Sequence, residues 1–489
     1  MMRRLVSRLA AVVWLAAQAI AAVAAPNVVW IVVDDMSADF SSYGQRLIET
    51  PHVDRLAATG TRFTRGYTTA PVCSPSRSAL ITGMAQTAIG GHHHRSSRGR
   101  LEIHLPPPVR PLPERFRAAG YYTCIGEGVP VRDAPGQRLG KTDYNFVWDP
   151  AIYDGPDWSG RRDGQPFFMQ VMLPGGKLRD GAPERAAEVR RRAAEVFGAA
   201  TDPEAVELPP YLPRDPVLLA DQAAYLDAVR LTDRAVGDVL ERLEAEGIRD
   251  ETVVVFLTDH GISHARAKQF LYDSGTHVPL VISGPGIPTA AVRDDLVPLI
   301  DVAATSLAAA GIAVPEWMQG RDLFAPDFTP RRHVFAARDR CDETVDRIRS
   351  VRDDRYLLIR NGHPRRPLLQ PNAYKDAKPT LRTLRELHAT GRLDPLAERI
   401  LFAPERPAEE LYLYRDDPWQ IENLAADPAH AGALADLRLT LDRWMAANGD
   451  DRPEPESMYD SDMEVYVGTG NPEVERNIAL MKEWARTGR

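Results

Sequence analysis

Cysteine is scarce in this chain of 489 residues, which contains only Cys73, Cys124 and Cys341. So few thiols exclude the dense disulfide framework that stabilises small secreted domains. Because the number is odd, at least one thiol has no partner within the chain. If Cys73 is set aside, Cys124 and Cys341 either form a disulfide or are buried as two small hydrophobic residues, and the second alternative is favoured.

An excess of positive charge is also missing. The chain has 60 lysines and arginines against 68 aspartates and glutamates, which gives a formal net charge of −8 at pH 7. This balance excludes nucleic-acid binding through a global positive field. The hydrophobic content of 44% is ordinary for a soluble globular protein. At roughly 100–200 residues per domain, the length predicts two domains, or one large domain with an appendage.

Long apolar runs are confined to the N-terminus. The chain begins with the basic stretch MMRRLVSR, followed by an apolar core over about residues 9–23 that ends in small residues. This order is typical of a signal peptide, and the core is shorter than the ~20 residues that a membrane anchor needs. We therefore expect residues 1–24 to be a signal peptide, removed on export to the periplasm or the exterior, and the exported protein to have no stable membrane anchor.

Two apolar segments end abruptly in polar, ionisable residues. They are NVVWIVVDD, which ends in Asp34 and Asp35, and TVVVFLTDHG, which contains Asp259 and His260. Such runs are typical of strands that are buried on both faces of a parallel sheet. Helical patterns alternate with them, including a long one over about residues 216–247. The sequence therefore predicts an α/β fold with a largely parallel sheet flanked by helices.

The hydrophobic pattern of the sequence changes near residue 346. Residues 25–345 are predicted to form the larger α/β domain, and residues 346–489 a smaller C-terminal α+β domain. In the smaller domain, SVRDDRYLLIRNG and EELYLYRDD are expected to be strands of a half-exposed antiparallel sheet, with AGALADLRLTLDRWMAANG as a helix packed on it. In the larger domain, Asp233 falls on the apolar stripe of the long helix. Asp233 either orients a buried group or reaches water at the edge of the stripe, and the second alternative is favoured.

The two strand ends also indicate a metal site. Ligands bind beyond the carboxyl ends of parallel strands, so two segments far apart in the sequence can meet there. The carboxylates of Asp34, Asp35 and Asp259 suit a hard divalent cation, Ca²⁺ or Mg²⁺. A pair of adjacent acids is weak evidence by itself, because it often marks only a turn. The imidazole of His260 is a softer ligand than Ca²⁺ normally takes.

Cys73 lies in the segment APVCSPSRSALITG, residues 70–83. A nucleophilic thiolate needs a lowered pKa and a histidine partner, and the run HHHRSSR follows later in the chain. A cysteine hydrolase therefore stays open as an interpretation. A buried structural cysteine is the better interpretation of one cysteine taken alone.

The wider context of Cys73 is more specific. The motif CSPSR followed by SALITG resembles the C-x-P-x-R signature of type I sulfatases, in which the cysteine is oxidised to formylglycine. The segments PNVVWIVVDDMSADFSSYG and TVVVFLTDHGISHARAKQFLYDSG look like the family's N-terminal and second metal-binding blocks, and EELYLYRDDPWQIENLAADP is similar to its C-terminal block. The resemblance covers about residues 27–450 and is strongest to the N-sulfoglucosamine sulfohydrolase (heparan N-sulfatase) branch. It implies the alkaline-phosphatase-like sulfatase fold, with residues 25–345 as the catalytic domain.

In this family the hydrated formylglycine carries two hydroxyls on one carbon. One attacks sulfur and displaces the alcohol or amine, and the other is then deprotonated and expels sulfate. The resemblance therefore implies that a formylglycine-generating or equivalent modifying enzyme converts Cys73. It also implies that Arg77, one helical turn further on, orients the hydrated aldehyde.

The same resemblance implies the remaining roles. The cation polarises the sulfate and the attacking oxygen. Lys141 in GKTDYNF and Lys268 in ARAKQFLYD match basic positions that neutralise the charge of the transferring sulfate. The implied catalytic residues are Cys73, Arg77, Lys141 and Lys268, and the implied ligands of Ca²⁺ are Asp34, Asp35, Cys73, Asp259 and His260.

Two departures from the family pattern leave the leaving group without an assigned proton donor. Asp143 stands where the family's G-K-x-H segment has histidine. The segment LPGGK stands where relatives usually carry the histidine that protonates the leaving group. Either Lys177 substitutes for it or a histidine comes from elsewhere, the candidates being His92, His93, His94 and His264.

Two further segments are candidates for substrate contact. The loop GGHHHRSSR is expected to hold an anionic sugar, although a metal-scavenging or merely exposed run has the same composition. The segment FAARDRCDETVD contributes Arg338 or Arg340 to the pocket, unless it is a solvated domain junction. The predicted substrate-binding residues are His94, Lys177, His264 and Arg338.

The sequence thus predicts an exported sulfatase that hydrolyses sulfate esters or N-sulfamates of sulfated carbohydrates, using formylglycine and bound Ca²⁺ or Mg²⁺. Three alternatives stay open. A phosphonate or phosphate ester hydrolase uses the same fold and the same modified cysteine. A non-catalytic relative would bind sulfoglycans without cleaving them, and a cysteine hydrolase would keep the thiol of Cys73.

Overall fold

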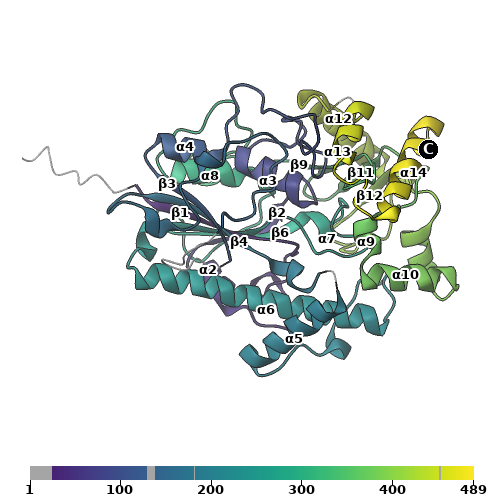
Figure 1. Ribbon diagram of the computed structural model, residues 1–489, viewed down its shortest axis with the longest axis horizontal. Coiled ribbons are helices and arrows are strands. Elements are labelled where there is room, and N and C mark those ends of the chain that lie inside the picture. The colour runs from purple at the N-terminus through teal and green to yellow at the C-terminus, as the bar shows by residue number, and fades with distance from the viewer. Residues whose placement is uncertain (1–24, 129–137, 181, 451–452) are drawn as a thin grey trace, which may run out of the picture.

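The parallel strands expected from the sequence lie at the centre of the molecule (Figure 1). The computed structural model describes residues 25–128, 138–180, 182–450 and 453–489. The predicted signal peptide, residues 1–24, lies outside the described residues. Within the described ranges, no helix is both long enough and apolar enough to cross a bilayer.

The central sheet has eight strands in the described residues, in the order β3–β4–β1–β5–β6–β2–β7, with β8 paired to β2. Neighbours are parallel from β3 through β4 and β1 to β5, whereas β6 runs antiparallel to both β5 and β2. The strands are β1 (Asn27–Val33), β2 (Thr61–Tyr67), β3 (Tyr122–Glu127), β4 (Phe167–Leu173), β5 (Thr252–Thr258), β6 (His277–Ser283), β7 (Ala291–Arg293) and β8 (Val297–Pro298). The largely parallel sheet expected from the sequence is confirmed, and its β6–β2 side is mixed.

Helices cover both faces of this sheet (Figure 1). Val28, Trp30 and Val32 of β1 belong to a core shared with α3, α4 and α8, whereas Val29 and Ile31 face a core shared with α2 and α6. These helices are α2 (Pro51–Ala58), α3 (Cys73–Thr82), α4 (Leu112–Ala118), α6 (Pro216–Ala245) and α8 (Asp301–Ala309). Since alternate residues of a strand point to opposite faces, a strand between two helical layers must be apolar throughout. The uninterrupted apolar runs therefore predicted β1 and β5 correctly.

Asp233 is buried in α6 and does not reach water. Its carboxylate accepts hydrogen bonds from the backbone N–H groups of His52 and Val53, at 3.2 and 2.8 Å. These two N–H groups belong to the first turn of α2. The residue before this helix, Thr50, makes no side-chain capping hydrogen bond. The favoured expectation of a solvated acid is therefore wrong. Asp233 satisfies N–H groups that a helix start leaves free, and so fixes α2 against α6.

The C-terminal part of the chain forms a second, antiparallel sheet in the order β12–β11–β10–β9. Its strands are β9 (Val334–Arg338), β10 (Ile348–Arg352), β11 (Leu357–Asn361) and β12 (Glu409–Tyr412). The expectation that this sheet is half-exposed is wrong, because every residue of β10 is buried. One face packs on α12 (Ala431–Ala447) through Val351, and the other packs through Ile348 on a cluster that includes Phe270, from the segment after β5.

Further α-helices lie in the described part of the chain. They are α5 (Pro183–Phe197), α7 (Asp273–Thr276), α9 (Ala373–Asp376), α10 (Pro379–Ala389), α11 (Pro395–Ala397), α13 (Glu456–Met463) and α14 (Pro472–Thr487). In Figure 1, α12, α13 and α14 lie together at the end of the molecule that holds the second sheet. The domain division at residue 345 stays a prediction. Strand β9 belongs to the second sheet but lies before residue 345, within the segment assigned to the larger domain.

Cys124 and Cys341 are buried and free. Cys124 lies within β3 of the central sheet, and Cys341 follows β9 of the second sheet. Burial raises the pKa of both thiols, which keeps them neutral and unreactive. The interpretation of these two cysteines as small buried hydrophobic residues is confirmed.

Candidate active site

The carboxyl ends of β1 and β5 meet at one edge of the central sheet. The two strands are parallel neighbours, and the backbone N–H of Asp259 donates to the carbonyl of Val33 over 2.9 Å. The polar residues that follow the two strands are therefore neighbours, all at most 5% exposed: Asp34, Asp35, Asp259 and His260. The convergence expected from the sequence is present.

Cys73 is the first residue of α3 and faces this edge. Its Sγ lies 3.2 Å from Nε2 of His260 and 3.4 Å from Nζ of Lys177. Burial alone would raise the pKa of the thiol, but the charges of three nearby lysines outweigh burial and lower the pKa well below its ordinary value. The N-terminal end of a helix adds a partial positive charge at the same place. The surroundings of Cys73 therefore stabilise negative charge.

Arg77 lies one turn further along α3 and joins the two strand ends. Its Nε donates to Oδ2 of Asp259 at 2.9 Å, and its Nη2 donates to Oδ1 of Asp34. The guanidinium is buried with both carboxylates. One side chain thus fixes the helix that carries Cys73 against β1 and β5.

Two lysines predicted from the sequence also reach these carboxylates. The Nζ of Lys141 lies 3.3 Å from each carboxylate oxygen of Asp34. The Nζ of Lys268 lies 2.9 and 3.0 Å from the oxygens of Asp35. Lys141 lies between β3 and β4 and Lys268 follows β5, so their convergence is a property of the fold.

Lys177 enters the site because two glycines precede it. A side chain at Gly175 would lie 2.3 Å from the carbonyl oxygen of Asp34, and one at Gly176 would lie 2.1 Å from that of Asp35. No other residue fits so close to the end of β1, and Gly175 also has a positive φ of 51°. The Nζ of Lys177 lies 2.8 Å from Oδ2 of Asp34. The LPGGK segment therefore combines a close backbone approach to the end of β1 with a lysine that reaches Asp34.

These residues fit a hard divalent cation. Ligand atoms of Asp34, Cys73 and Asp259 all lie within 4.8 Å of one another, and the same holds for Asp35, Cys73 and His260. Asp35 adopts a φ of 55°, which is uncommon outside glycine and occurs at functional sites. Three buried carboxylates are the oxygen donors that Ca²⁺ and Mg²⁺ prefer.

His260 is the least typical member of the group. Its Nδ1 lies 2.9 Å from the carbonyl oxygen of Gly261, which leaves Nε2 directed at Cys73. Burial opposes protonation, but the negative charge of Asp259 and of the groups around it raises the pKa of His260 to about 10. A cation bound to the carboxylates would compete with that proton.

Above Cys73 the chain forms a cavity of about 430 Å³. Its wall combines several of the residues predicted from the sequence with others that were not. The residues that line it include Cys73, His94, Arg95, Lys141, Asp143, Lys177, Asp180, Arg185, Lys268, Asp342, Tyr374 and Lys378. The size suits part of a sugar chain, and the excess of basic side chains suits an anionic one.

Of the four histidines considered as proton donor, His94 is the one that lines the cavity. Ligand atoms of His94, Cys73 and Asp143 all lie within 4.8 Å of one another. The Nδ1 of His94 also lies 3.3 Å from Oδ1 of Asp342, within ion-pair distance although not aligned as a hydrogen bond. His94 and Lys177 are thus the two predicted substrate-binding residues in the cavity wall.

The other two predicted substrate-binding residues are engaged elsewhere. The Nε2 of His264 lies 3.0 Å from Oδ2 of Asp221 on α6. Arg338 is buried and forms an ion pair with Asp346. Neither side chain is among those that line the cavity above Cys73.

Several cavity residues carry no sequence signal that would have identified them. Tyr374 of α9 donates to Asp180 at 2.6 Å, and Lys378 also pairs with Asp180. Tyr374 and Lys378 come from the segment between β11 and β12, and Asp180 comes from the turn after β4. Their juxtaposition depends on tertiary packing. Asp342, in contrast, lies in the charged segment FAARDRCDETVD, from which the sequence predicts only Arg338 or Arg340 as a pocket residue.

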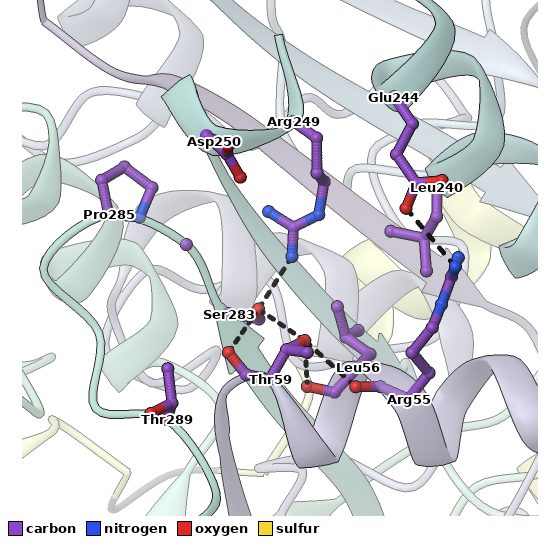
Figure 2. A pocket seen from close by; sticks show the side chains of 11 residues that line it. Arg55, Leu56, Thr59, Leu240, Glu244, Arg249, Asp250, Ser283, Pro285 and Thr289 are labelled. Carbon is purple, nitrogen blue, oxygen red and sulfur yellow. Dashed lines mark hydrogen bonds and ion pairs between the residues drawn. The ribbon is translucent and has the colours of Figure 1, made fainter. Parts of the chain in front are cut away.

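A second cavity, of about 470 Å³, lies at the opposite edge of the sheet (Figure 2). Ser283 pairs with Val254, near the beginning of β5, so this cavity is remote from the strand ends that hold the carboxylates. Figure 2 shows Arg249 directed at Ser283, whose Oγ accepts a hydrogen bond at 2.8 Å. None of the predicted site residues is among those that line it.

The chain matches the sulfatase family model over residues 26–312. It is 34% identical over 470 residues to an ulvan-active sulfatase of Formosa agariphila, covering 88% of this chain and 76% of that protein. It is 27% identical over 468 residues to the N-sulphoglucosamine sulphohydrolase of Homo sapiens, covering 86% and 89%.

Solved structures share the fold. One, in complex with its substrate D-glucosamine-2-N,6-O-disulfate, matches with a TM-score of 0.60 at 16% identity, covering 88% of this chain and 99% of that one. The phosphonate monoester hydrolase of Agrobacterium radiobacter matches with a TM-score of 0.59 at 18% identity, covering 86% and 96%. At these identities the structures establish the fold only.

Replacing Arg77 tests whether it holds the site together. In the variant Arg77→Leu the buried carboxylates of Asp34 and Asp259 lose their guanidinium partner, so we expect the free energy of unfolding to fall by about 3–5 kcal/mol. Denaturant titration followed by circular dichroism measures this. The control is Arg191→Leu on α5, an exposed arginine with two exposed ion pairs, which should cost less than about 0.5 kcal/mol. Equal losses in the two variants would contradict the role of Arg77.

Proposed function

Because the chain belongs to the sulfatase family, we propose that it hydrolyses sulfate esters or sulfamates of sulfated carbohydrates through a formylglycine made from Cys73. The family establishes the general class, a sulfuric ester or sulfamate hydrolase. The observation that carries the finer proposal is the position of Cys73, buried below a basic cavity and beside two strand ends with three carboxylates. The sulfated substrates named for the relatives support the substrate class.

A divalent cation, Ca²⁺ or Mg²⁺, would be held by Asp34, Asp35 and Asp259, with residue 73 and His260 as further ligands. When bound, it polarises the sulfate and lowers the pKa of the attacking hydroxyl. Arg77 keeps residue 73 in place beside these carboxylates through its two ion pairs. The Sγ of Cys73 stands where the oxygens of the hydrated aldehyde would lie.

The lysines account for recognition of the sulfate group. Lys141, Lys177 and Lys268 lie around residue 73, and Nζ of Lys177 is only 3.4 Å from its Sγ. Preorganised positive charge in a dry site stabilises the charge that develops on the sulfate oxygens more strongly than water does. Lysine at position 177 therefore supplies positive charge in the segment where relatives carry a histidine.

His94 is the residue that we assign as proton donor to the leaving oxygen or nitrogen. It lines the cavity near residue 73, and the Asp342 carboxylate lies 3.3 Å from its Nδ1. A carboxylate beside one ring nitrogen helps to orient the imidazole and leaves the other nitrogen for proton transfer. Lys177 is the alternative donor, but its Nζ is already engaged with Asp34 at 2.8 Å.

Two events before catalysis complete the proposal. The N-terminal signal peptide would direct export to the periplasm or the exterior, and a formylglycine-generating or equivalent enzyme would oxidise Cys73.

Parallel assays separate the proposal from its rivals. With an aryl sulfate and the matching aryl phosphonate, we expect the sulfate to be hydrolysed faster, and we expect chelation to abolish the activity until Ca²⁺ is restored. Initial rates of aryl alcohol release measure both. A phosphonate hydrolysed orders of magnitude faster would identify a phosphonate hydrolase. Binding of sulfated glycans without sulfate release, across a panel of sugars, would identify a non-catalytic relative.

Leaving-group dependence tests the role of His94. The variant His94→Ala should lose about 10²–10⁴ in kcat on a sulfated sugar, whose alcohol needs a proton to leave. It should lose far less on a nitrophenyl sulfate, whose leaving group departs as a stable anion. Lys177→Ala is the comparison, and it should lose activity on both substrates alike. If Lys177→Ala instead shows the selective loss, Lys177 and not His94 is the donor.

A further inference from the structure

Behind the wall of the active-site cavity lies a cluster made of two neighbouring histidines and an aspartate. One ring nitrogen each of His92 and His93 and one carboxylate oxygen of Asp339 all lie within 4.8 Å of one another. The two imidazole rings are tilted, with centroids 4.2 Å apart. None of the three residues is among those that line the cavity above Cys73.

Three polar atoms of this cluster are buried without hydrogen-bond partners, and Nδ1 of His93 lies 3.7 Å from Oε1 of Glu454. Nδ1 of His92, Nδ1 of His93 and Oδ2 of Asp339 have no hydrogen-bond partner among the described residues. His93 and Asp339 are each only 5% exposed. Buried polar atoms are almost always paired, because an unpaired one costs about 1–3 kcal/mol. Each of the three residues thus combines an unpaired buried polar atom with a ligand atom of the 4.8 Å cluster, which points to a bound ion as their partner.

We propose that His92, His93 and Asp339 bind a divalent transition-metal ion, with zinc as the best match. Two imidazoles and one carboxylate are typical of zinc sites and unsuitable for Ca²⁺ or Mg²⁺, which prefer oxygen donors. The site is separate from the predicted cation site at the strand ends, since the two share no residue. Its existence does not depend on the proposed sulfatase activity.

The protonation of the histidines supports metal binding. Burial lowers the pKa of His92 and of His93, so both imidazoles are neutral at neutral pH. A neutral imidazole offers the lone pair that a metal ion needs, and binding displaces no proton from it.

The charges around the cluster also admit a cation. Oδ1 of Asp339 accepts from Nη2 of Arg349 at 3.0 Å, but Arg349 is shared with Asp450, whose Oδ1 lies 2.6 Å from the same nitrogen. Four carboxylates in this region face three guanidinium groups: Asp339, Asp450, Glu454 and Asp462 against Arg340, Arg349 and Arg347. With all of these groups ionised the carboxylates exceed the arginines by one charge, although burial raises the pKa of Glu454 to about 7.

The proposed ion would join the two segments that carry the proton donor and its carboxylate. His93 immediately precedes His94, and Asp339 lies three positions before Asp342. The segments already run side by side, because the backbone N–H of His94 donates to the carbonyl of Arg340 at 2.8 Å. By binding His93 and Asp339, a metal ion would hold the two segments together and so fix the distance between His94 and Asp342.

Zinc titration of the full-length mature protein tests the proposal. The parent is the Cys73→Ala variant saturated with Ca²⁺, because Cys73 is a shared member of the other clusters that could take zinc. We expect calorimetry with Zn²⁺ to show one tight site per chain in this parent. His93→Gln and Asp339→Asn in the same background should each weaken that site by at least about tenfold. His104→Gln, which changes an exposed histidine, is the matched control and should leave the affinity unchanged.

Absence of a tight site in the parent, or equal zinc affinity in parent, variants and control, overturns the proposal. Circular dichroism shows whether the variants are folded. If either variant fails to fold, anomalous scattering at the zinc edge from parent crystals grown with Zn²⁺ decides. A peak between His92, His93 and Asp339 supports the site, and a peak elsewhere or none contradicts it. Because these experiments measure binding and not turnover, their failure leaves the sulfatase proposal intact.

Discussion

The ion pairs of Arg77 with Asp34 and Asp259 are the constraint on which the rest of the site depends. Asp34 follows β1, Asp259 follows β5, and Arg77 lies one turn after Cys73 on α3. A single buried guanidinium therefore joins the central sheet to the helix that presents residue 73. Buried charges persist only when they are paired, so the carboxylates, the guanidinium and the surrounding lysines stabilise one another.

The balance of charge explains why this edge of the sheet suits sulfate. Four cationic side chains, Arg77, Lys141, Lys177 and Lys268, face the three carboxylates of Asp34, Asp35 and Asp259. Asp143, which lies 3.4 Å from Nζ of Lys141, balances the fourth positive charge, and a divalent ion would make the site positive. An anionic group that enters the cavity above residue 73 therefore meets a site already organised for negative charge.

Much of this site could be predicted from the sequence, because it depends on local patterns. Apolar runs that end in acids located β1 and β5, and the CSPSR motif located Cys73 and Arg77. Features that arise from packing between distant segments could not be predicted in this way. Asp233 was expected to be solvated, yet it caps α2 from α6. The second sheet was expected to be half-exposed, yet β10 is buried between α12 and the segment after β5. Among four candidate histidines, only tertiary structure distinguishes His94 from the rest.

The central claim is that the thiol encoded at position 73 is converted to an aldehyde that acts as nucleophile. The most direct test is the mass of the peptide that spans residue 73, measured in protein purified from its own host with full activity. Conversion to formylglycine removes H₂S and adds oxygen, so the account predicts a mass about 18 Da below that of the cysteine peptide. An unmodified, alkylatable thiol at Cys73 in fully active protein would contradict it.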